Sequence, residues 1–301
     1  MKRKVIQLAG KTLIVSLPSK WAKAYGVKKG DDIEVSEDDK RLIISPDVKF
    51  SSEKVTLSSK DLGHFDKNYI SYLYQKGCDE IRINYDSPEI SKDINERVSN
   101  LLGFEIIDKG ENYFVIKNVS DVLEEEFDTL LRRTFLIIIE IGKSSLDALK
   151  KDERDRLEEI GHLEDMVDKF TDFCKRLLNK KGFKDFKKTP YVYTIIRDLE
   201  KVGDFYKYIC EYLSNNKDVK VDKETLLLLE QTNNFFELYY NLFYKFSKEK
   251  ATEFHSKKKS LLKQGYLLME KRNSDVLIVH HLVSLIMMIS DMYGPYYMTQ
   301  I

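Results

Sequence analysis

The sequence predicts a multidomain protein with a small β-rich N-terminal domain over residues 1–50, a small α+β linker domain over 51–119, and an all-α C-terminal domain over 120–301. Three observations predict this order. Short apolar runs alternate with turn residues in the first fifty positions, an alternating apolar pattern appears near residue 80, and apolar residues recur every three or four positions from about residue 122 onward. The length of 301 residues leaves room for two or three domains.

The composition excludes several classes of protein. Hydrophobic residues make up 42% of the chain, and 13 Gly and 5 Pro are too few for a disordered or collagen-like sequence. The cysteines at positions 78, 174 and 210 lie far apart, which argues against a disulfide framework. Free thiols are typical of a reducing compartment, so we expect a cytoplasmic protein.

The first domain reads as strand, strand, helix, strand, strand. Gly26 closes the short helix as a left-handed cap, and Lys29–Asp32 forms a turn before the second strand pair, whose tip is at Asp38 and Asp39. The predicted elements are residues 5–8, 12–17, 20–25, 33–35 and 41–45. Fifty residues bury little apolar area, so we expect this domain to need a partner.

The linker domain has a strand, a helix and a hairpin. Ile81, Ile83 and Tyr85 alternate in a strand over 79–85, and Ser87 followed by Pro88 opens a helix that runs to about residue 102. Two apolar runs, at 104–107 and 113–116, then flank a turn sequence that is typical of a hairpin.

The C-terminal domain has the periodicity of six helices. Their number and the short loops between them favour a pair of three-helix bundles, over 120–215 and 220–301. The apolar stretch 276–292 carries His, Ser and Asp residues, so we expect a buried helix and no membrane insertion. The predicted helices cover about residues 122–141, 152–180, 190–213, 223–248, 250–271 and 274–293.

The net charge of zero hides a segregation of charge. Residues 1–30 carry eight Lys and Arg and no acidic residue, whereas residues 31–50 carry seven acidic and three basic residues. Basic side chains neutralise phosphates and release counterions, so the first cluster is a candidate surface for the DNA backbone. On charge alone, an ordinary solvated face explains it equally well.

The motif pattern of residues 3–46 resembles the AbrB/MazE/SpoVT DNA-binding family. The shared features are a basic strand start, a Gly-basic turn, a strand that ends in Leu-Pro, and a helix that ends in Gly-hydrophobic-x-x-Gly-Asp; here they are Arg3-Lys4, Gly10-Lys11, Leu17-Pro18 and Gly26–Asp31. The resemblance implies a homodimer in which two chains interleave their hairpins into one swapped-hairpin barrel that binds double-stranded DNA. It also implies that the DNA contacts are made by Arg3, Lys4, Lys11, Lys20 and Lys23.

Two predicted helices each carry a Glu and an Asp four residues apart, Glu164 with Asp168 and Glu200 with Asp204. Such residues are neighbours on a helix surface, and carboxylates on adjacent helices can hold a hard metal ion. On a helical wheel they lie beside the apolar stripe, which predicts surface groups and not a buried pair. From the spacing alone, a solvated charged face is the more common explanation.

Residues 197–204, Arg-x-Leu-Glu-Lys-Val-Gly-Asp, resemble a signature of the PhoU family, and the resemblance covers about residues 121–293. It implies a divalent or trivalent metal ion at the first bundle, held by Glu164, Asp168, Glu200 and Asp204. The second bundle departs from the family pattern, because Met287 and Lys257–Lys259 stand where acidic residues are expected. We therefore expect that a second metal site is lost.

These features predict a transcriptional regulator that binds DNA and has no enzymatic activity, since the chain lacks nucleophile and phosphate-loop motifs. By resemblance, fused AbrB-like and PhoU-like segments are associated with phosphate-uptake regulation in archaea. The alternative is a PhoU-like adaptor that acts on a phosphate transporter or a sensor kinase, with the barrel used only for dimerisation. The basic cluster favours the first interpretation, because the adaptor leaves that cluster without a role.

Overall fold

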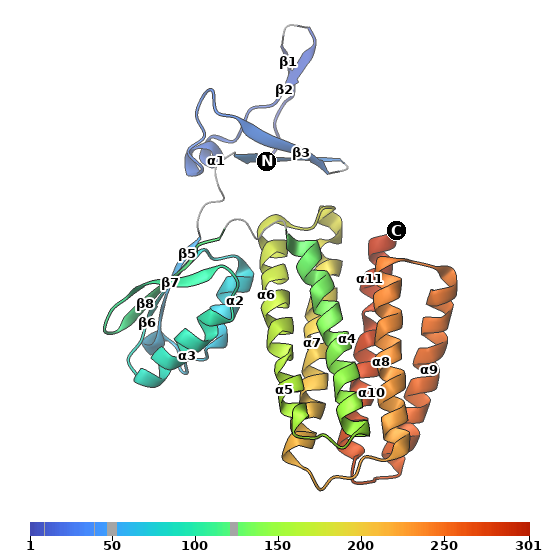
Figure 1. The fold of residues 1–301 in the computed structure, drawn as a ribbon. Helices are drawn as coiled ribbons and strands as arrows, with labels where there is room; N and C mark the ends of the chain where they lie inside the picture. Colours follow the sequence, from blue (N-terminus) through green and yellow to red (C-terminus); the bar gives the residue numbers. More distant parts are fainter. Residues whose placement is uncertain (9, 39, 47–52, 121–125) are drawn as a thin grey trace. The chain divides into compact units, whose positions relative to one another are not determined.

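The computed structural model describes residues 1–8, 10–38, 40–46, 53–120 and 126–301 (Figure 1). The chain divides into two compact units, Met1–Glu53 and Lys54–Ile301. A small strand-rich N-terminal region followed by a large helical part is confirmed. The predicted tip residue Asp39, the predicted boundary at residue 50 and the first residues of the helix expected from 122 lie outside the described residues.

The first unit contains two separate hairpins and one short helix. The strands β1 and β2 pair antiparallel with Ile6 opposite Ile14, and β3 and β4 pair with Ile33 opposite Pro46. Gly26 follows the helix with a φ of 68°, as the sequence predicted for a left-handed cap. The elements are β1 (Ile6–Leu8), β2 (Thr12–Ile14), α1 (Ser19–Ala24), β3 (Ile33–Asp38) and β4 (Arg41–Pro46).

The second unit begins with an α+β part built on a four-stranded sheet of order β5-β6-β8-β7. Strands β5 and β6 are parallel, and β8 runs antiparallel to both of its neighbours. The helices α2 and α3 cover one face of this sheet (Figure 1). The elements are β5 (Lys54–Ser58), η1 (Ser59–Asp61), α2 (Asn68–Lys76), β6 (Glu80–Asn84), α3 (Pro88–Ser99), β7 (Phe104–Lys109) and β8 (Tyr113–Asn118).

Within this part, two elements lay outside the prediction. The sequence did not indicate β5 or α2, although the Ser87 cap of α3 and the β7–β8 hairpin were predicted and are present. Helix α2 contains three tyrosines and the β-branched Ile70, residue types of modest helix propensity. Burial of Ile70 and Tyr74 stabilises it in the fold.

Six of the remaining helices pack in two groups of three, and α5 and α11 both contact α7. Helices α4, α6 and α7 contact one another, and so do α8, α9 and α10, while α4 contacts α8 and α7 contacts α10. The predicted helix over 152–180 is divided at Leu163 into α5 and α6. The elements are α4 (Phe127–Lys150), α5 (Arg156–His162), α6 (Glu164–Lys181), η3 (Phe186–Lys188), α7 (Thr189–Asn215), α8 (Lys223–Tyr244), α9 (Lys248–Glu270), α10 (Val276–Asp291) and α11 (Tyr293–Gln300).

One helical stretch among the described residues, Val276–Gln300, is long and apolar enough to cross a membrane by length and composition. This is weak evidence, because a buried core helix has the same composition. Its residues Leu282, Leu285 and Ile286 are fully buried in the bundle.

A buried arginine of helix α6 connects this helix to the α+β part through hydrogen bonds and an ion pair. The Arg176 guanidinium, of which 3% of the side chain is exposed, pairs with Asp79 and donates to the carbonyl oxygens of Tyr74 and Cys78 at 2.9 and 2.6 Å. Lys180 reaches the same Asp79 carboxylate at 2.7 Å. A buried charge is stable only when it is paired and hydrogen-bonded, so these contacts define how α2 sits on α6.

Candidate DNA-binding residues and carboxylate cluster

The basic residues predicted to contact DNA all lie on the surface of the first unit. Arg3 and Lys4 precede β1, and Lys11 lies in the turn between β1 and β2. Lys20 and Lys23 lie on α1, three residues apart and therefore on one side of the helix. All five side chains are exposed and face no acidic partner among the described residues, so they are available to an anionic ligand.

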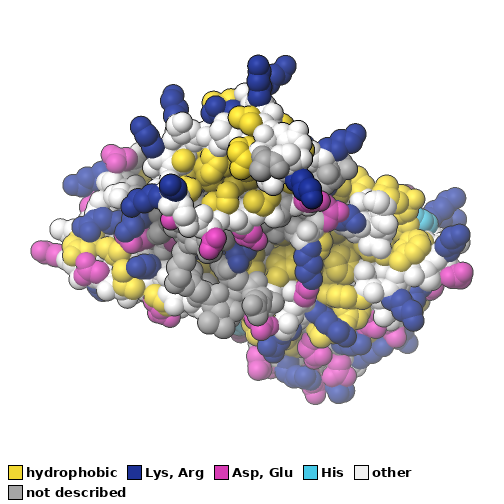
Figure 2. All heavy atoms as spheres, turned by 90° about the horizontal axis from the view of Figure 1, so that it is seen from above, with side chains coloured by type: hydrophobic (Ala, Val, Ile, Leu, Met, Phe, Trp, Pro, Cys, Tyr) yellow, Lys and Arg dark blue, Asp and Glu magenta, His cyan; other side chains and the backbone are white. Residues whose placement is uncertain are grey.

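The same unit leaves its apolar residues in solvent. Among its described residues, not one is buried, and Leu13 and Leu42 are 69% and 63% exposed. Trp21 is only half-buried and packs against the ring of Tyr25. Figure 2 shows exposed apolar side chains gathered between Lys and Arg side chains. The other exposed large apolar residues are Met1, Val5, Ile6, Leu8, Ile14, Val15, Tyr25, Val35 and Ile43.

A cluster of three carboxylates forms between α6 and α7. Oxygen atoms of Glu164, Asp168 and Asp204 lie within 4.8 Å of one another. Glu164 begins α6 and Asp168 follows one turn later, while Asp204 comes from α7. The structure thus brings three of the four predicted metal ligands together.

Gly203 permits the close approach of the two helices. A Cβ atom at this position would lie 3.1 Å from the Val167 Cγ1 atom and 3.4 Å from the Glu164 Cγ atom. This is the physical reason for a glycine directly before Asp204 in the motif at 197–204. Without the side chain, α7 can place Asp204 against the start of α6.

The fourth predicted ligand, Glu200, points elsewhere. Its Oε2 atom pairs with the ammonium of Lys175, a side chain that is only 5% exposed. Because Lys175 is buried, it needs this carboxylate as a partner. Three of the four residues predicted to hold a metal ion therefore lie together, and Glu200 pairs with Lys175 instead.

The burial of the cluster corrects the expectation of surface groups. Glu164 is fully buried, and Asp168 and Asp204 are half-buried. The helical wheel considers one helix alone, whereas here α7 packs over the side of α6 that carries these carboxylates. Lys207 on α7 adds to this cover, because its Nζ atom donates to Glu164 Oε2 at 2.7 Å.

Two oxygen atoms in the cluster lack partners. Glu164 Oε1 and Asp168 Oδ1 are buried and find no hydrogen-bond partner in the part of the chain that the structure describes. Burial and the neighbouring Asp168 carboxyl raise the pKa of Glu164 to about 8, and burial also raises the pKa of Asp168. Two such carboxyls must share a proton or hold a cation, so the donor set fits a hard metal ion.

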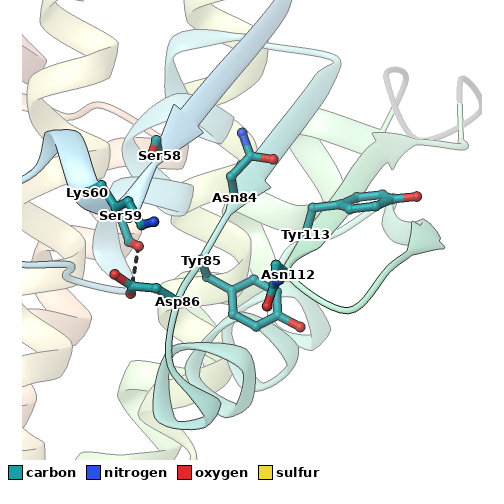
Figure 3. Close-up of a pocket in the computed structure, with 8 residues that line it drawn as sticks. All are labelled: Ser58, Ser59, Lys60, Asn84, Tyr85, Asp86, Asn112 and Tyr113. Atoms are coloured by element: carbon teal, nitrogen blue, oxygen red, sulfur yellow. Dashed lines mark hydrogen bonds between the residues drawn. The ribbon is translucent and has the colours of Figure 1, made fainter.

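A second polar site lies in the α+β part, at the carboxyl ends of the parallel strands β5 and β6 (Figure 3). It is a cavity of about 570 Å³ in which Ser59 Oγ donates to Asp86 Oδ1 at 2.9 Å. This site was not predicted from the sequence, because strand β5 was not predicted. The lining residues are Ser58, Ser59, Lys60, Asn84, Tyr85, Asp86, Asn112 and Tyr113.

Comparison with known proteins concerns the first unit. Residues 6–51 match the MazE family, described as antidote-toxin recognition MazE, bacterial antitoxin. This likeness indicates a regulator of the DNA-binding or antitoxin type, and domains of the MazE/AbrB type commonly bind DNA and dimerise. No curated protein and no solved structure matches the chain. The match does not reach the helices of the second unit, and the resemblance of residues 121–293 to the PhoU family stays a prediction.

The raised pKa of Glu164 predicts a pH dependence of stability. The pKa lies near 8 in the folded protein, against an ordinary value of 4.5, so the folded state binds a proton more tightly than the unfolded state. This stabilisation is complete below about pH 4.5 and is lost as the pH rises through about 8. In a chelating buffer, we expect the stability of Glu164→Gln relative to the wild type to rise by up to about 1.4 kcal/mol per pH unit in this window.

The measurement is urea unfolding of the full chain at pH 5, 6.5 and 8. The exposed neighbour Glu159 supplies the control, since Glu159→Gln should keep the wild-type pH slope. Equal pH slopes for Glu164→Gln and the wild type would contradict the assignment.

Proposed function

We propose that this chain is a DNA-binding regulator that acts as a homodimer and holds a hard metal ion in its helical part. The observation that carries the proposal is the N-terminal unit, which combines exposed apolar residues with a cluster of basic residues. The exposed apolar residues favour association with a second copy of the chain, and the basic residues favour binding of an anionic ligand. The match of residues 6–51 to the MazE family supports both.

Dimerisation follows from the cost of exposed apolar surface. Burial stabilises a protein by about 25 cal/mol for each Å² of apolar surface removed from water. A unit whose described residues are all at least partly exposed gains little from its own packing. Two copies that interleave their hairpins into one barrel would bury Leu13, Val35 and Leu42, and would create the core that one copy lacks.

DNA binding follows from the charge that remains outside such a core. Arg3, Lys4 and Lys11 extend from the first hairpin, and Lys20 and Lys23 from α1, so each copy offers five cations to phosphates. In a dimer these cations are present twice. Contacts to the phosphate backbone give affinity and position the protein on the DNA. The basic residues of this unit would supply this electrostatic contribution to affinity.

The metal ion is proposed for the three clustered carboxylates. Glu164, Asp168 and Asp204 would hold it, and the ion would supply the positive charge that the two unpartnered oxygens lack. Lys201 and Lys207 already pair with Asp204 and Glu164, so a bound ion competes with two ammonium groups. A role in phosphate uptake rests on the PhoU resemblance alone and stays a prediction.

A second candidate function is that of an antitoxin, which the description of the matched family favours. In that case the exposed apolar residues of the N-terminal unit would bind a toxin protein. Because domains of the matched type commonly bind DNA and dimerise, the two candidates differ in what covers the exposed apolar residues, a second copy of the chain or a toxin protein, and the self-association experiment below tests this difference.

The self-association of the first unit is tested with Leu42→Glu. Leu42 is 63% exposed in one copy, so the substitution costs a monomer little, but it places a charge in the core of a dimer. We expect that two differently tagged copies of the full chain co-purify as wild type and fail to do so as Leu42→Glu.

The control is Ile107→Glu, a change at a residue of β7 that is 50% exposed. This variant should co-purify like the wild type. Co-purification of Leu42→Glu at the wild-type level would contradict the proposed dimer.

The DNA contacts are tested with the double variant Arg3→Ala/Lys11→Ala. Each phosphate contact contributes about 0.9 to the slope of log affinity against log salt concentration, so the variant should bind DNA more weakly and with a shallower slope. Fluorescence anisotropy on a panel of duplexes at several salt concentrations measures both.

The matched control is Lys40→Ala/Arg41→Ala, which removes the same charge from the tip of the other hairpin. It should keep most of the salt slope. If both double variants lower the slope equally, the predicted residues are not the contact surface. If neither changes it, the adaptor interpretation gains support.

A further inference from the structure

We propose that cation binding at the carboxylate cluster is transmitted to helix α2 through a chain of alternating charges formed by Lys201, Glu200, Lys175 and Asp172. The inference rests on the proposed cation site and adds a means of regulation to it. The starting point is Glu164, which is fully buried, belongs to the cluster and leaves its Oε1 atom without a hydrogen-bond partner among the described residues.

The chain begins at the edge of the cluster. The Nζ atom of Lys201 donates to Asp204 Oδ2 at 2.7 Å and lies 3.6 Å from Glu200 Oε1. Lys201 thus pairs with Asp204, which belongs to the carboxylate cluster, and also lies near Glu200, which does not. A cation bound by Asp204 takes over one of the two partners of this lysine.

The middle of the chain is buried. The ammonium of Lys175 pairs with Glu200 Oε2 and lies 3.7 Å from Asp172 Oδ1, with 5% of the Lys175 side chain and 4% of the Asp172 side chain exposed. Charges in such a position depend on their partners, because water does not reach them. A weaker bond between Lys175 and Glu200 therefore strengthens the interaction of Lys175 with Asp172.

The chain ends on the α+β part. Asp172 Oδ1 accepts a hydrogen bond from Gln75 Nε2 of α2 at 2.7 Å, and its Oδ2 atom accepts one from the Arg97 guanidinium of α3 at 3.1 Å. Arg97 also donates to the Ser71 hydroxyl. Asp172 therefore connects the chain of charges to the α+β part, because Lys175 approaches the same Asp172 oxygen that accepts the hydrogen bond from Gln75.

The direction of the effect follows from these contacts. A cation at Glu164, Asp168 and Asp204 releases Lys201 from Asp204 and leaves it with Glu200. The interaction of Glu200 with Lys175 then weakens, and Lys175 competes more strongly with Gln75 for Asp172 Oδ1. Cation binding thus loosens the hold of α6 on α2, and by linkage a loosened α2 favours the bound cation. The assigned role of Glu200 is to position Lys175.

The test uses hydrogen exchange of the full chain, stripped with a chelator and then titrated with Mn²⁺, a hard cation that carboxylates bind. Electron paramagnetic resonance of free Mn²⁺ measures binding in the same samples. For the wild type we expect exchange of residues 68–76 to become at least twofold faster on Mn²⁺ binding. In Lys201→Met, Mn²⁺ should still bind, but exchange of this segment should no longer respond.

Two further variants make the test specific. Lys201 is 48% exposed, so its replacement leaves the core intact, and Lys143→Met removes a similarly exposed lysine that pairs with Glu237 far from the chain of charges. Lys143→Met should respond like the wild type, whereas Asp204→Asn should lose both Mn²⁺ binding and the response.

The outcomes separate the two proposals. If Mn²⁺ binds the wild type without any change in exchange over residues 68–76, or if Lys201→Met responds like the wild type, the transmission is wrong and the cation site stands. If the wild type does not bind Mn²⁺, both proposals fall.

Discussion

The described residues of the N-terminal unit do not enclose a core, and the proposed function of the molecule depends on this constraint. Its two hairpins pair only within themselves, and none of its described residues is buried, so apolar side chains such as Leu13 and Leu42 face solvent. Association relieves this cost and, in the same step, doubles the set of exposed basic residues. A single physical requirement thus accounts for both the proposed dimer and the proposed binding of DNA.

The second unit shows the opposite arrangement: the first unit exposes apolar side chains, whereas helix α6 of the second unit buries charged ones. Glu164, Asp172, Lys175 and Arg176 all lie inside the protein, and each of them obtains a partner on another element. Buried charges hold their neighbours in place more strictly than apolar contacts do, since a lost partner leaves an uncompensated charge. This makes α6 the element at which a bound cation and the position of the α+β part are able to influence each other.

Much of this organisation was predictable from sequence, for reasons that are local. Ser87 before Pro88, the β7–β8 turn and the helical periodicity beyond residue 126 act through neighbours in the chain. Helix α2 was missed because its stability comes from burial of Ile70 and Tyr74, which propensity does not report. Of the four metal ligands that the PhoU resemblance implied, Glu164, Asp168 and Asp204 lie together. The pairing of Glu200 with Lys175 and the burial of Glu164 depend on how two helices pack around Gly203, which the spacing does not report.

The central claim is that the N-terminal unit is completed by a second copy of the chain, and the mass of the wild-type protein in solution tests it most directly. Sedimentation equilibrium of the full chain, without DNA, measures this mass independently of shape. The account predicts a species of twice the 35.4 kDa chain mass that persists as the protein is diluted to the low micromolar range. A mass of 35.4 kDa at every concentration would contradict it.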